Sequence, residues 1–280
     1  MKTIALLTDF GYGEYVGIMK GVIVTHCKQP VNIIDITHSI EPQNILQASW
    51  ILSTAVPYFP EGTVFVCVVD PGVGGERNAI LIETNKCFLI GPNNGIFTHT
   101  LKMCDLEILH IYELNTKQSS NTFQGRDVFS KNAGLLCHSN SLEMIDGKRN
   151  DDIIIEYLSL YSNHVKCCTH LTNESNSNRN EKEIIVQIVS IDSFGNLISD
   201  YFVSNQNEIE QMKRIQSIQF VSSDESIPIH FCKTYEEGSK HSYPLICLIG
   251  SNNTFEISVV NGNAQKHLHC SIGSLIKLQF

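Results

Sequence analysis

Three polar loops in the N-terminal half carry side chains that could bind a small molecule. Asp9 follows an apolar run in LLTDFG, Asp70 follows another in VVDPGVG, and two asparagines follow a third in LIGPNNG. A carboxylate accepts two hydrogen bonds and suits a diol, while the glycines beside Asp70 would let backbone approach a ligand. Arg77 lies beyond this glycine-rich loop and can pair with Asp70. Any one such motif is typical of an ordinary strand end, but the three together favour a binding site.

The elements that must position these loops alternate between strands and helices. Apolar runs predict strands at 3–9, 31–37 and 63–70, and helical spacing predicts helices at 13–27 and 42–56. AILIET and CFLIGP are expected to be two further strands. This alternation predicts an α/β domain with a mostly parallel sheet covered by helices. Ligands bind at the carboxyl ends of strands in such sheets, so the three loops should lie close together.

The C-terminal part of the chain has a different character. Residues 172–183 are polar and lack apolar periodicity, which is typical of a linker or insertion. Short apolar strands at close spacing follow and predict a smaller all-β domain. The predicted organisation is therefore an α/β domain at 1–165, a polar linker or insertion at 166–184, and a β domain at 185–280.

Composition excludes several classes of protein. The 280 residues are 42% hydrophobic and 18% charged, as in soluble globular proteins. The net charge of −9 comes without a basic stripe, which argues against a nucleic-acid partner. No apolar run approaches the roughly 20 residues of a membrane helix, and the N-terminus reads as a first strand, not as a signal peptide.

The cysteines and the missing motifs limit the chemistry further. Ten cysteines form no CxxC pair, and several lie in apolar runs, which indicates buried thiols in a reducing, cytoplasmic compartment. The sequence shows no zinc or magnesium constellation and no P-loop, GxGxxG or GxSxG motif. We therefore expect no metal, no cofactor and no covalent intermediate.

Five further strings complete a recognisable pattern: YVGIMKG, IIDITHSIEP, TFQGRD, IDSFGNLIS and SNNTFEISVVNGNA. With the three loops, they resemble the S-adenosylmethionine hydroxide adenosyltransferases, relatives of the fluorinases and chlorinases, in order along nearly the whole chain. The resemblance implies an α/β domain followed by a barrel-like β domain. It also implies homotrimers, with each site between one subunit's N-terminal domain and a neighbour's C-terminal domain. The implied reaction is hydrolysis of S-adenosylmethionine to adenosine and L-methionine, by attack of water or hydroxide at ribose C5′.

The resemblance also assigns roles to residues of the N-terminal domain. Asp9 would bind the ribose hydroxyls, and Asp70 and Arg77 would handle the water. Gln124 stands where the family has histidine in TFHGRD, and a glutamine cannot take up a proton at neutral pH. A weakly active or inactive protein that binds adenosine or S-adenosylmethionine is therefore the alternative. His38, in DITHSIEP, is the nearest replacement by motif, but a structural imidazole is favoured there.

In the C-terminal domain the resemblance assigns five binding residues. Phe194 and Asn196 would contact adenine, since an aromatic ring stacks on a purine and an amide matches its hydrogen-bonding edge. Asp192 would hold the methionine ammonium group. Ser251, and less specifically Glu256, would contact the methionine carboxylate or the adenosine. The alternative for all five is a β-turn with a core phenylalanine and capping polar groups.

Halogenation of the same substrate is the other reaction that the resemblance allows. The halogenating relatives carry tyrosine where Asp70 stands and serine where Gly125 stands, and they have an N-domain loop that this chain lacks. An anionic Asp70 beside the nucleophile should repel halide. These departures favour hydrolysis.

Overall fold

The computed structural model describes residues 1–139, 142–158, 183–241 and 243–280, which form two compact units, Met1–Leu158 and Ser159–Phe280. Within the predicted linker at 166–184, residues 166–182 lie outside the described residues, and the last two belong to the first strand of the C-terminal unit.

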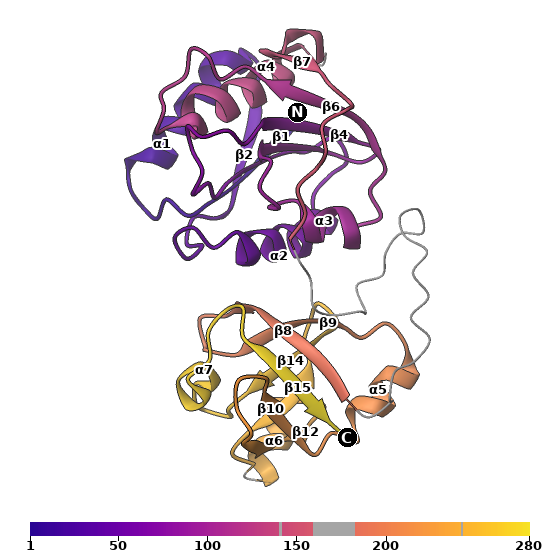
Figure 1. Ribbon diagram of the computed structural model, residues 1–280. Helices are drawn as coiled ribbons and strands as arrows, with labels where there is room; N and C mark the ends of the chain where they lie inside the picture. The colour runs from indigo at the N-terminus through magenta and orange to yellow at the C-terminus, as the bar shows by residue number, and fades with distance from the viewer. Residues whose placement is uncertain (140–141, 159–182, 242) are drawn as a thin grey trace. The chain divides into compact units, whose positions relative to one another are not determined.

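A seven-stranded sheet forms the centre of the N-terminal unit, in the order β2-β1-β3-β5-β4-β6-β7 (Figure 1). The strands are β1 (Lys2–Thr8), β2 (Val31–Thr37), β3 (Val64–Val68), β4 (Ala79–Thr84), β5 (Phe88–Pro92), β6 (Ile108–Leu114) and β7 (Gly147–Arg149). Neighbours from β2 to β5 pair in parallel, and the remaining neighbours pair antiparallel. Because only β4 and β7 are reversed, five of the seven strands run in one direction, and the predicted α/β class with a mostly parallel sheet is confirmed.

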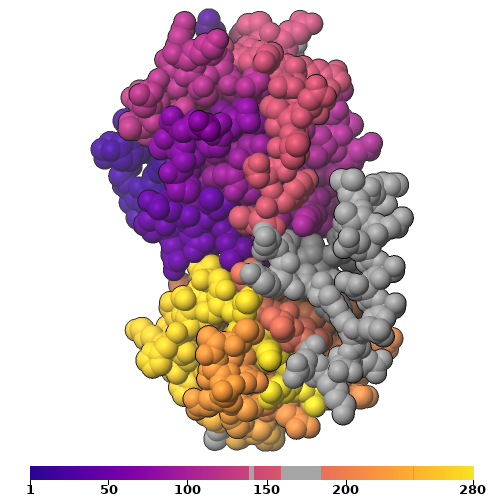
Figure 2. All heavy atoms as spheres, viewed as in Figure 1, coloured from indigo at the N-terminus to yellow at the C-terminus, as the bar shows by residue number. Residues whose placement is uncertain are grey.

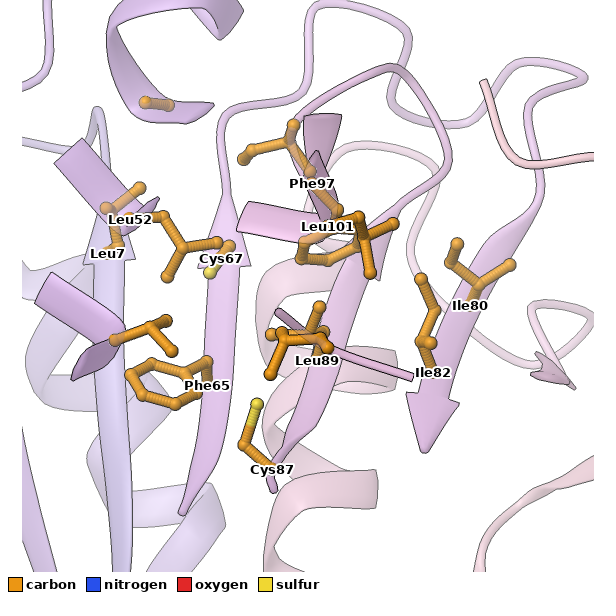
Figure 3. Close-up of a cluster of buried hydrophobic side chains, with 14 of the residues drawn as sticks. Leu7, Leu52, Phe65, Cys67, Ile80, Ile82, Cys87, Leu89, Phe97 and Leu101 are labelled. Carbon is orange, nitrogen blue, oxygen red and sulfur yellow. The ribbon is translucent and has the colours of Figure 1, made fainter. Parts of the chain in front are cut away.

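Helices cover both faces of this sheet. They are α1 (Glu14–Cys27), α2 (Ile45–Ala55), α3 (Thr98–Met103) and α4 (Lys131–Ser139), with a π-helical turn at Gly125–Ser130 and short 3₁₀ turns at Val56–Tyr58 and Leu142–Met144. Leu52 of α2 and Leu101 of α3 pack on one face, against strand residues such as Phe65 and Leu89 (Figure 3). Residues of α1 and α4 pack in a second core on the other face.

Strand β3 illustrates why the sequence shows continuous apolar runs. Phe65 and Cys67 belong to one core, whereas Val64, Val66 and Val68 belong to the other, and all five side chains are buried. Successive side chains of a strand point to opposite faces. A strand covered by helices on both faces therefore needs apolar residues at every position.

An eight-stranded sheet forms the C-terminal unit, in the order β11-β10-β15-β8-β9-β14-β13-β12. Its strands are β8 (Glu183–Ile191), β9 (Leu197–Phe202), β10 (Ser217–Phe220), β11 (Ser226–Pro228), β12 (His230–Phe231), β13 (Ile246–Ile249), β14 (Thr254–Ser258) and β15 (Leu275–Gln279). The two edge strands, β11 and β12, are separated in the chain by Ile229 alone, so one short segment supplies both edges. This arrangement nearly closes the sheet, and the predicted barrel-like domain is confirmed.

The C-terminal unit also contains elements that the sequence pattern did not predict. Three short helices lie between strands, α5 (Gln206–Met212), α6 (Tyr235–His241) and α7 (Ala264–Leu268), and β9 was not predicted as a strand. Asp200 interrupts the apolar pattern of β9, yet it is buried and accepts a hydrogen bond of 2.8 Å from the Gln187 backbone N–H. A buried, hydrogen-bonded acid breaks the apolar pattern that predicts a strand, so the sequence pattern did not predict β9.

Two expectations from composition bear on the described residues. The cysteines described there are free thiols, and all of them except Cys104 are buried. None of the helices described is long and apolar enough to cross a membrane.

His99, in α3, is a fully buried imidazole. Its Nδ1 lies 3.0 Å from Ser49 Oγ, and its Nε2 has no hydrogen-bond partner among the described residues. Burial, with a smaller contribution from Lys102, lowers the pKa of His99 to about 4. The folded protein therefore holds this side chain in its neutral form.

This burial predicts a loss of stability in acid. Between about pH 6.5, where a free histidine titrates, and about pH 4, the unfolded chain binds a proton at His99 that the folded chain does not. The free energy of unfolding should therefore fall as the pH falls through this window, with a His99 contribution of about 1.4 kcal/mol per pH unit. Urea unfolding of the parent and His99→Gln at pH 7, 6 and 5 measures it. The variant should show the shallower dependence, and parallel curves would contradict the prediction.

Candidate active site

The carboxyl ends of β1, β3 and β5 lie side by side at one edge of the sheet. Thr8 is in register with Val68 of the neighbouring strand, and Asn94, just after β5, donates a hydrogen bond of 3.0 Å to the Val69 carbonyl. The chain continues from β1 to β2 on one side and from β3 toward β5 on the other. Such a change of direction marks the usual ligand site of an open α/β sheet. The three polar loops therefore meet, as their sequence pattern predicts.

Asp70, Arg77 and Gln124 form one largely buried polar cluster at this edge. Arg77 Nε donates to Asp70 Oδ1 at 3.1 Å, and Arg77 Nη2 contacts the other carboxylate oxygen. The same Nη2 donates to Gln124 Oε1 at 2.5 Å. The Asp70 side chain is only 5% exposed and that of Arg77 12%. The fold thus unites all three predicted catalytic residues, although Gln124 is distant in the chain.

Arg77 retains one nitrogen in this cluster whose N–H groups are unused. Its Nη1 is buried and has no hydrogen-bond partner within the described part of the chain. The guanidinium also lies over the ring of Phe129, with 5.8 Å from its central carbon to the ring centroid. An unpaired buried donor is costly, and a ligand or water that accepted its hydrogen bond would remove that cost.

The glycine-rich loop between Asp70 and Arg77 packs on the segment before Gln124. Gly74 has a φ of +76°, and a Cβ there would overlap the carbonyl oxygen of Asn121. Only glycine adopts this conformation at such a close approach. The glycines therefore bring two distant loops together around the cluster.

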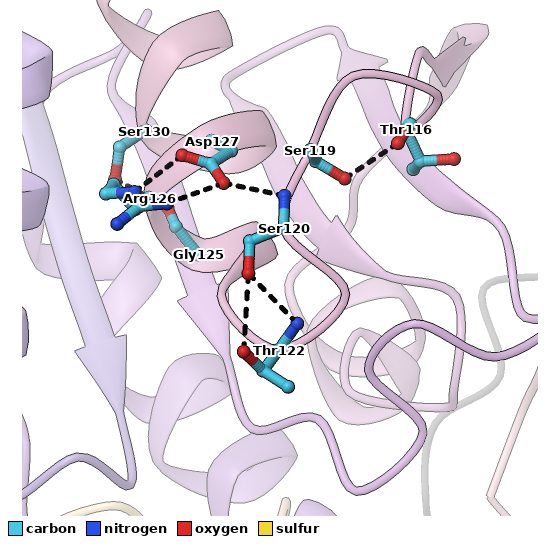
Figure 4. Close-up of polar contacts among 8 residues, drawn as sticks. All are labelled: Thr116, Ser119, Ser120, Thr122, Gly125, Arg126, Asp127 and Ser130. Carbon is cyan, nitrogen blue, oxygen red and sulfur yellow. Dashed lines mark hydrogen bonds and ion pairs between the residues drawn. The ribbon is translucent and has the colours of Figure 1, made fainter.

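A π-helical turn starting at Gly125 presents Gln124, and its first residues are tied to the preceding loop (Figure 4). Asp127 accepts a hydrogen bond of 2.8 Å from the Ser120 N–H and forms an ion pair with Arg126. The hydrogen bond from Arg126 is the main reason that the pKa of Asp127 lies below its usual range. The charged Asp127 thereby fixes the loop in TFQGRD that carries Gln124. Such π-helical turns are frequent at functional sites.

Asp9 lies half-buried after β1, and Gln43 of the next loop donates its backbone N–H to Asp9 Oδ2 at 2.8 Å. One such bond leaves most of the acceptor capacity of a carboxylate for a ligand. Among the described residues, no group of three or more His, Cys, Asp or Glu side chains could hold a metal ion.

Three aromatic rings connect the Asp9 loop with the Gln124 loop, a feature that the sequence analysis missed. Phe10, Tyr15 and Phe123 meet edge to face, with ring centroids 5.1 to 5.9 Å apart. Phe10 follows Asp9 and Phe123 precedes Gln124, so their positions beside candidate residues were the available signal. The ring contacts thus join the two loops that carry Asp9 and Gln124.

The two asparagines after β5 hold backbone segments. Asn93 donates to the Ile154 carbonyl and accepts from the Glu156 N–H, both at 2.9 Å. These bonds fix residues 150–158, which lie along the surface of the N-terminal unit (Figure 2). The third polar loop of the sequence pattern thus supports the edge of the sheet through its amide side chains.

In the C-terminal unit, the residues predicted to bind adenine and the methionine ammonium group lie in the turn between β8 and β9. Asp192 Oδ1 accepts from the backbone N–H groups of Phe194 and Asn196, both at 2.9 Å, and Oδ2 accepts from the Asn196 amide. The carboxylate therefore closes the turn. Phe194 is 75% exposed, so the alternative of a core phenylalanine is wrong. Its ring is available for stacking.

Tyr235, which the sequence analysis missed, links this turn to Glu256. Its hydroxyl donates to Glu256 Oε1 and accepts from the Asn196 amide at 3.3 Å. Burial first, and then Glu256, raises the pKa of Tyr235 to about 12. Tyr235 begins α6 outside every motif, so no sequence signal marked it. The fold thus brings Asn196 and Glu256 together and leaves Ser251 exposed in the turn before β14.

Comparisons with known proteins agree over both units. Residues 4–146 match the N-terminal domain of the SAM hydroxide adenosyltransferases, and residues 186–277 match their C-terminal domain. The chain is 34% identical to the (R)-S-adenosyl-L-methionine hydrolase of Methanocaldococcus jannaschii, covering 96% of this chain and 92% of that protein. It is 24% identical to a fluorinase of Actinopolyspora mzabensis over 55% of this chain and 60% of that protein.

A solved structure shares the whole architecture. An uncharacterized conserved protein from Thermotoga maritima superposes with a TM-score of 0.79 at 28% identity, covering 99% of this chain and 100% of that one. The two matched domains account for most of the sequence. The chain belongs to the SAM hydroxide adenosyltransferase family.

Proposed function

We propose that this protein hydrolyses S-adenosylmethionine to adenosine and L-methionine, with water or hydroxide attacking ribose C5′. The observation that carries this proposal is the largely buried cluster of Asp70, Arg77 and Gln124 at the carboxyl edge of the sheet. A relative matched over nearly the whole chain bears the name of a hydrolase of this substrate.

The chemistry needs alignment and a proton acceptor. A sulfonium is already an activated leaving group, so methionine departs as a neutral thioether and no general acid is required. Asp70 accepts a hydrogen bond from the attacking water and takes up its proton, while the unused Nη1 of Arg77 donates to the water oxygen. Aligning the water with the C5′–S bond is worth up to about 7–11 kcal/mol in favourable systems.

Gln124 acts in this scheme as a donor that orients the water. Its Oε1 accepts from Arg77, which leaves the two N–H groups of the amide for other partners. An amide does not take up a proton at neutral pH, so proton uptake falls to Asp70 alone. The proposal therefore places the general base on the carboxylate.

The remaining predicted residues hold the substrate. Asp9 binds the ribose hydroxyls, Phe194 stacks on adenine, and Asn196 reads its edge. Asp192 faces the methionine ammonium group, and the contacts of its carboxylate within the turn fix its position. Ser251 and Glu256 complete the contacts.

We further propose that the protein works as a cytoplasmic homotrimer without a cofactor. Each site would combine the N-terminal unit of one subunit with the C-terminal unit of a neighbour. This arrangement accounts for two polar clusters, one in each unit, that suit different parts of one substrate.

Two other functions remain candidates because of single residues. Gln124 in place of histidine favours a protein that binds S-adenosylmethionine or adenosine with little turnover. Halogenation is less well supported, because the anionic Asp70 lies in the cluster that would have to accept a halide.

Replacing Asp70 by asparagine should abolish most turnover. The substitution keeps the shape but removes the proton acceptor, and general-base catalysis is typically worth about 10²–10⁴-fold. Chromatography of adenosine and methionine released from S-adenosylmethionine gives kcat. Asp151→Asn is the matched control, since Asp151 also pairs with an arginine, Arg149, but on the β6–β7 side of the sheet. Equal rates in the parent and Asp70→Asn would contradict the proposal.

Replacing Gln124 by histidine should increase kcat, because an imidazole supplies a second proton acceptor beside Asp70. The same chromatographic assay separates the candidates. Product from the parent supports a hydrolase that works with glutamine. Product from Gln124→His alone would identify the natural chain as a binding protein, and product from neither would sink the hydrolase proposal.

Mixing two impaired variants, Asp70→Asn and Asn196→Ala, should restore activity if subunits share each site. Asp70→Asn damages only the N-terminal unit, and Asn196→Ala damages only the C-terminal unit. In co-expressed mixed trimers some sites combine two intact units, so hydrolysis should return to a fraction of the parent rate. Light scattering should give three times the mass of one chain. No recovery in mixed trimers would contradict a shared site.

A further inference from the structure

The loop after β2 braces the loop that carries Asp9 at three points. Gly11 donates its N–H to the His38 carbonyl at 2.8 Å, and Gln43 donates its N–H to Asp9 Oδ2 at 2.8 Å. The third contact joins side chains, with His38 Nδ1 2.9 Å from Thr8 Oγ1. The carboxylate and the backbone on both sides of it are thus held by one neighbouring loop.

The hydrogen bonds at Thr8 and the carboxylate of Asp35 together favour Nδ1 of His38 as the acceptor, because a carboxylate only accepts and faces the other ring nitrogen. Thr8 Oγ1 accepts the Phe10 N–H at 3.2 Å, so its own proton can be donated to His38 Nδ1. In this arrangement the ring proton is on His38 Nε2, which lies 3.2 Å from the acceptor Asp35 Oδ1. That contact is an ion-pair distance without hydrogen-bond alignment. The Thr8 bond is therefore the better-formed contact of the ring.

The imidazole of His38 does not form part of a second active site. Aspartate, histidine and threonine in series have the composition of a nucleophile triad. The Thr8 side chain is, however, fully buried, and its oxygen already accepts from Phe10. Asp35 is engaged as well, by Lys20 Nζ at 2.7 Å. The series can orient a loop, but it presents no accessible nucleophile.

We propose that His38 is a positioning residue that sets the geometry of Asp9 through Thr8. The inference rests on the proposed role of Asp9 in binding ribose. Thr8 is the last residue of β1, and its bonds to Phe10 and His38 fix the backbone on both sides of Asp9. Asp70, Arg77 and Gln124 lie on other loops, so loss of His38 weakens substrate binding and leaves the chemical step intact.

Three substitutions at His38 distinguish the contributions of its two ring nitrogens. His38→Asn keeps an acceptor near the position of Nδ1, His38→Gln keeps a polar group near Nε2, and His38→Ala removes both. Hydrogen exchange of the ligand-free protein reports the Phe10 and Gly11 amides directly. These amides should exchange faster in the alanine and glutamine variants and at the parent rate in the asparagine variant.

Binding and turnover give the second measurement. Calorimetry with adenosine and steady-state kinetics with S-adenosylmethionine should show Kd and KM raised about three- to ten-fold in the alanine and glutamine variants, the usual effect of one hydrogen bond. The kcat value should stay near that of the parent, and the asparagine variant should recover both constants. His138→Ala is the control, because His138 Nδ1 bonds the Cys27 carbonyl at 2.7 Å at the amino edge of the sheet.

The outcomes distinguish this inference from the proposed function. Unchanged amide exchange in all three variants, or an asparagine variant that behaves like alanine, overturns the positioning role. A fall in kcat with unchanged KM also overturns it. If the parent binds neither adenosine nor S-adenosylmethionine, the proposed function fails, and the exchange measurement still decides whether His38 braces the loop.

Discussion

The contact between Arg77 and Asp70 is the interaction on which the rest of the site depends. Two opposite charges with little exposure need close geometry and further hydrogen bonds to offset their desolvation. Both nitrogens Nε and Nη2 of Arg77 engage the carboxylate, and Gln124 accepts a further bond. The glycine-rich loop between Asp70 and Arg77 lets these groups approach to hydrogen-bonding distance. A side chain at Gly74 would overlap the Asn121 carbonyl and force the two loops to shift relative to each other.

The sheet decides where such a cluster can form. Helices bury both faces of β1, β3 and β5, so polar ligand-binding groups are restricted to the edges. Parallel neighbours place their carboxyl ends together, which is why loops separated by many residues converge. In the C-terminal unit the near-closed sheet leaves turns as the equivalent positions. Four of the five predicted binding residues lie in the turns before β9 and before β14, and Glu256 lies within β14 itself.

Hydrogen bonds with other segments hold candidate residues in both units. Asp9 accepts a hydrogen bond from the Gln43 backbone, Gln124 accepts one from Arg77, and Asn196 donates one to Tyr235, so each is held by a group from another segment. Such supporting contacts reduce the freedom that ligand binding would otherwise have to remove.

The sequence by itself determined the two-part architecture, the convergence of three loops and the pairing of Asp70 with Arg77, because apolar periodicity and local motifs are encoded over short stretches. It also identified Gln124 as the departure from the family pattern. Only the tertiary structure decided that Gln124 bonds Arg77, that Phe194 is exposed, that Tyr235 contacts Asn196, and that His38 contacts Thr8. These contacts join segments far apart in the chain, and their geometry depends on packing that no local pattern specifies.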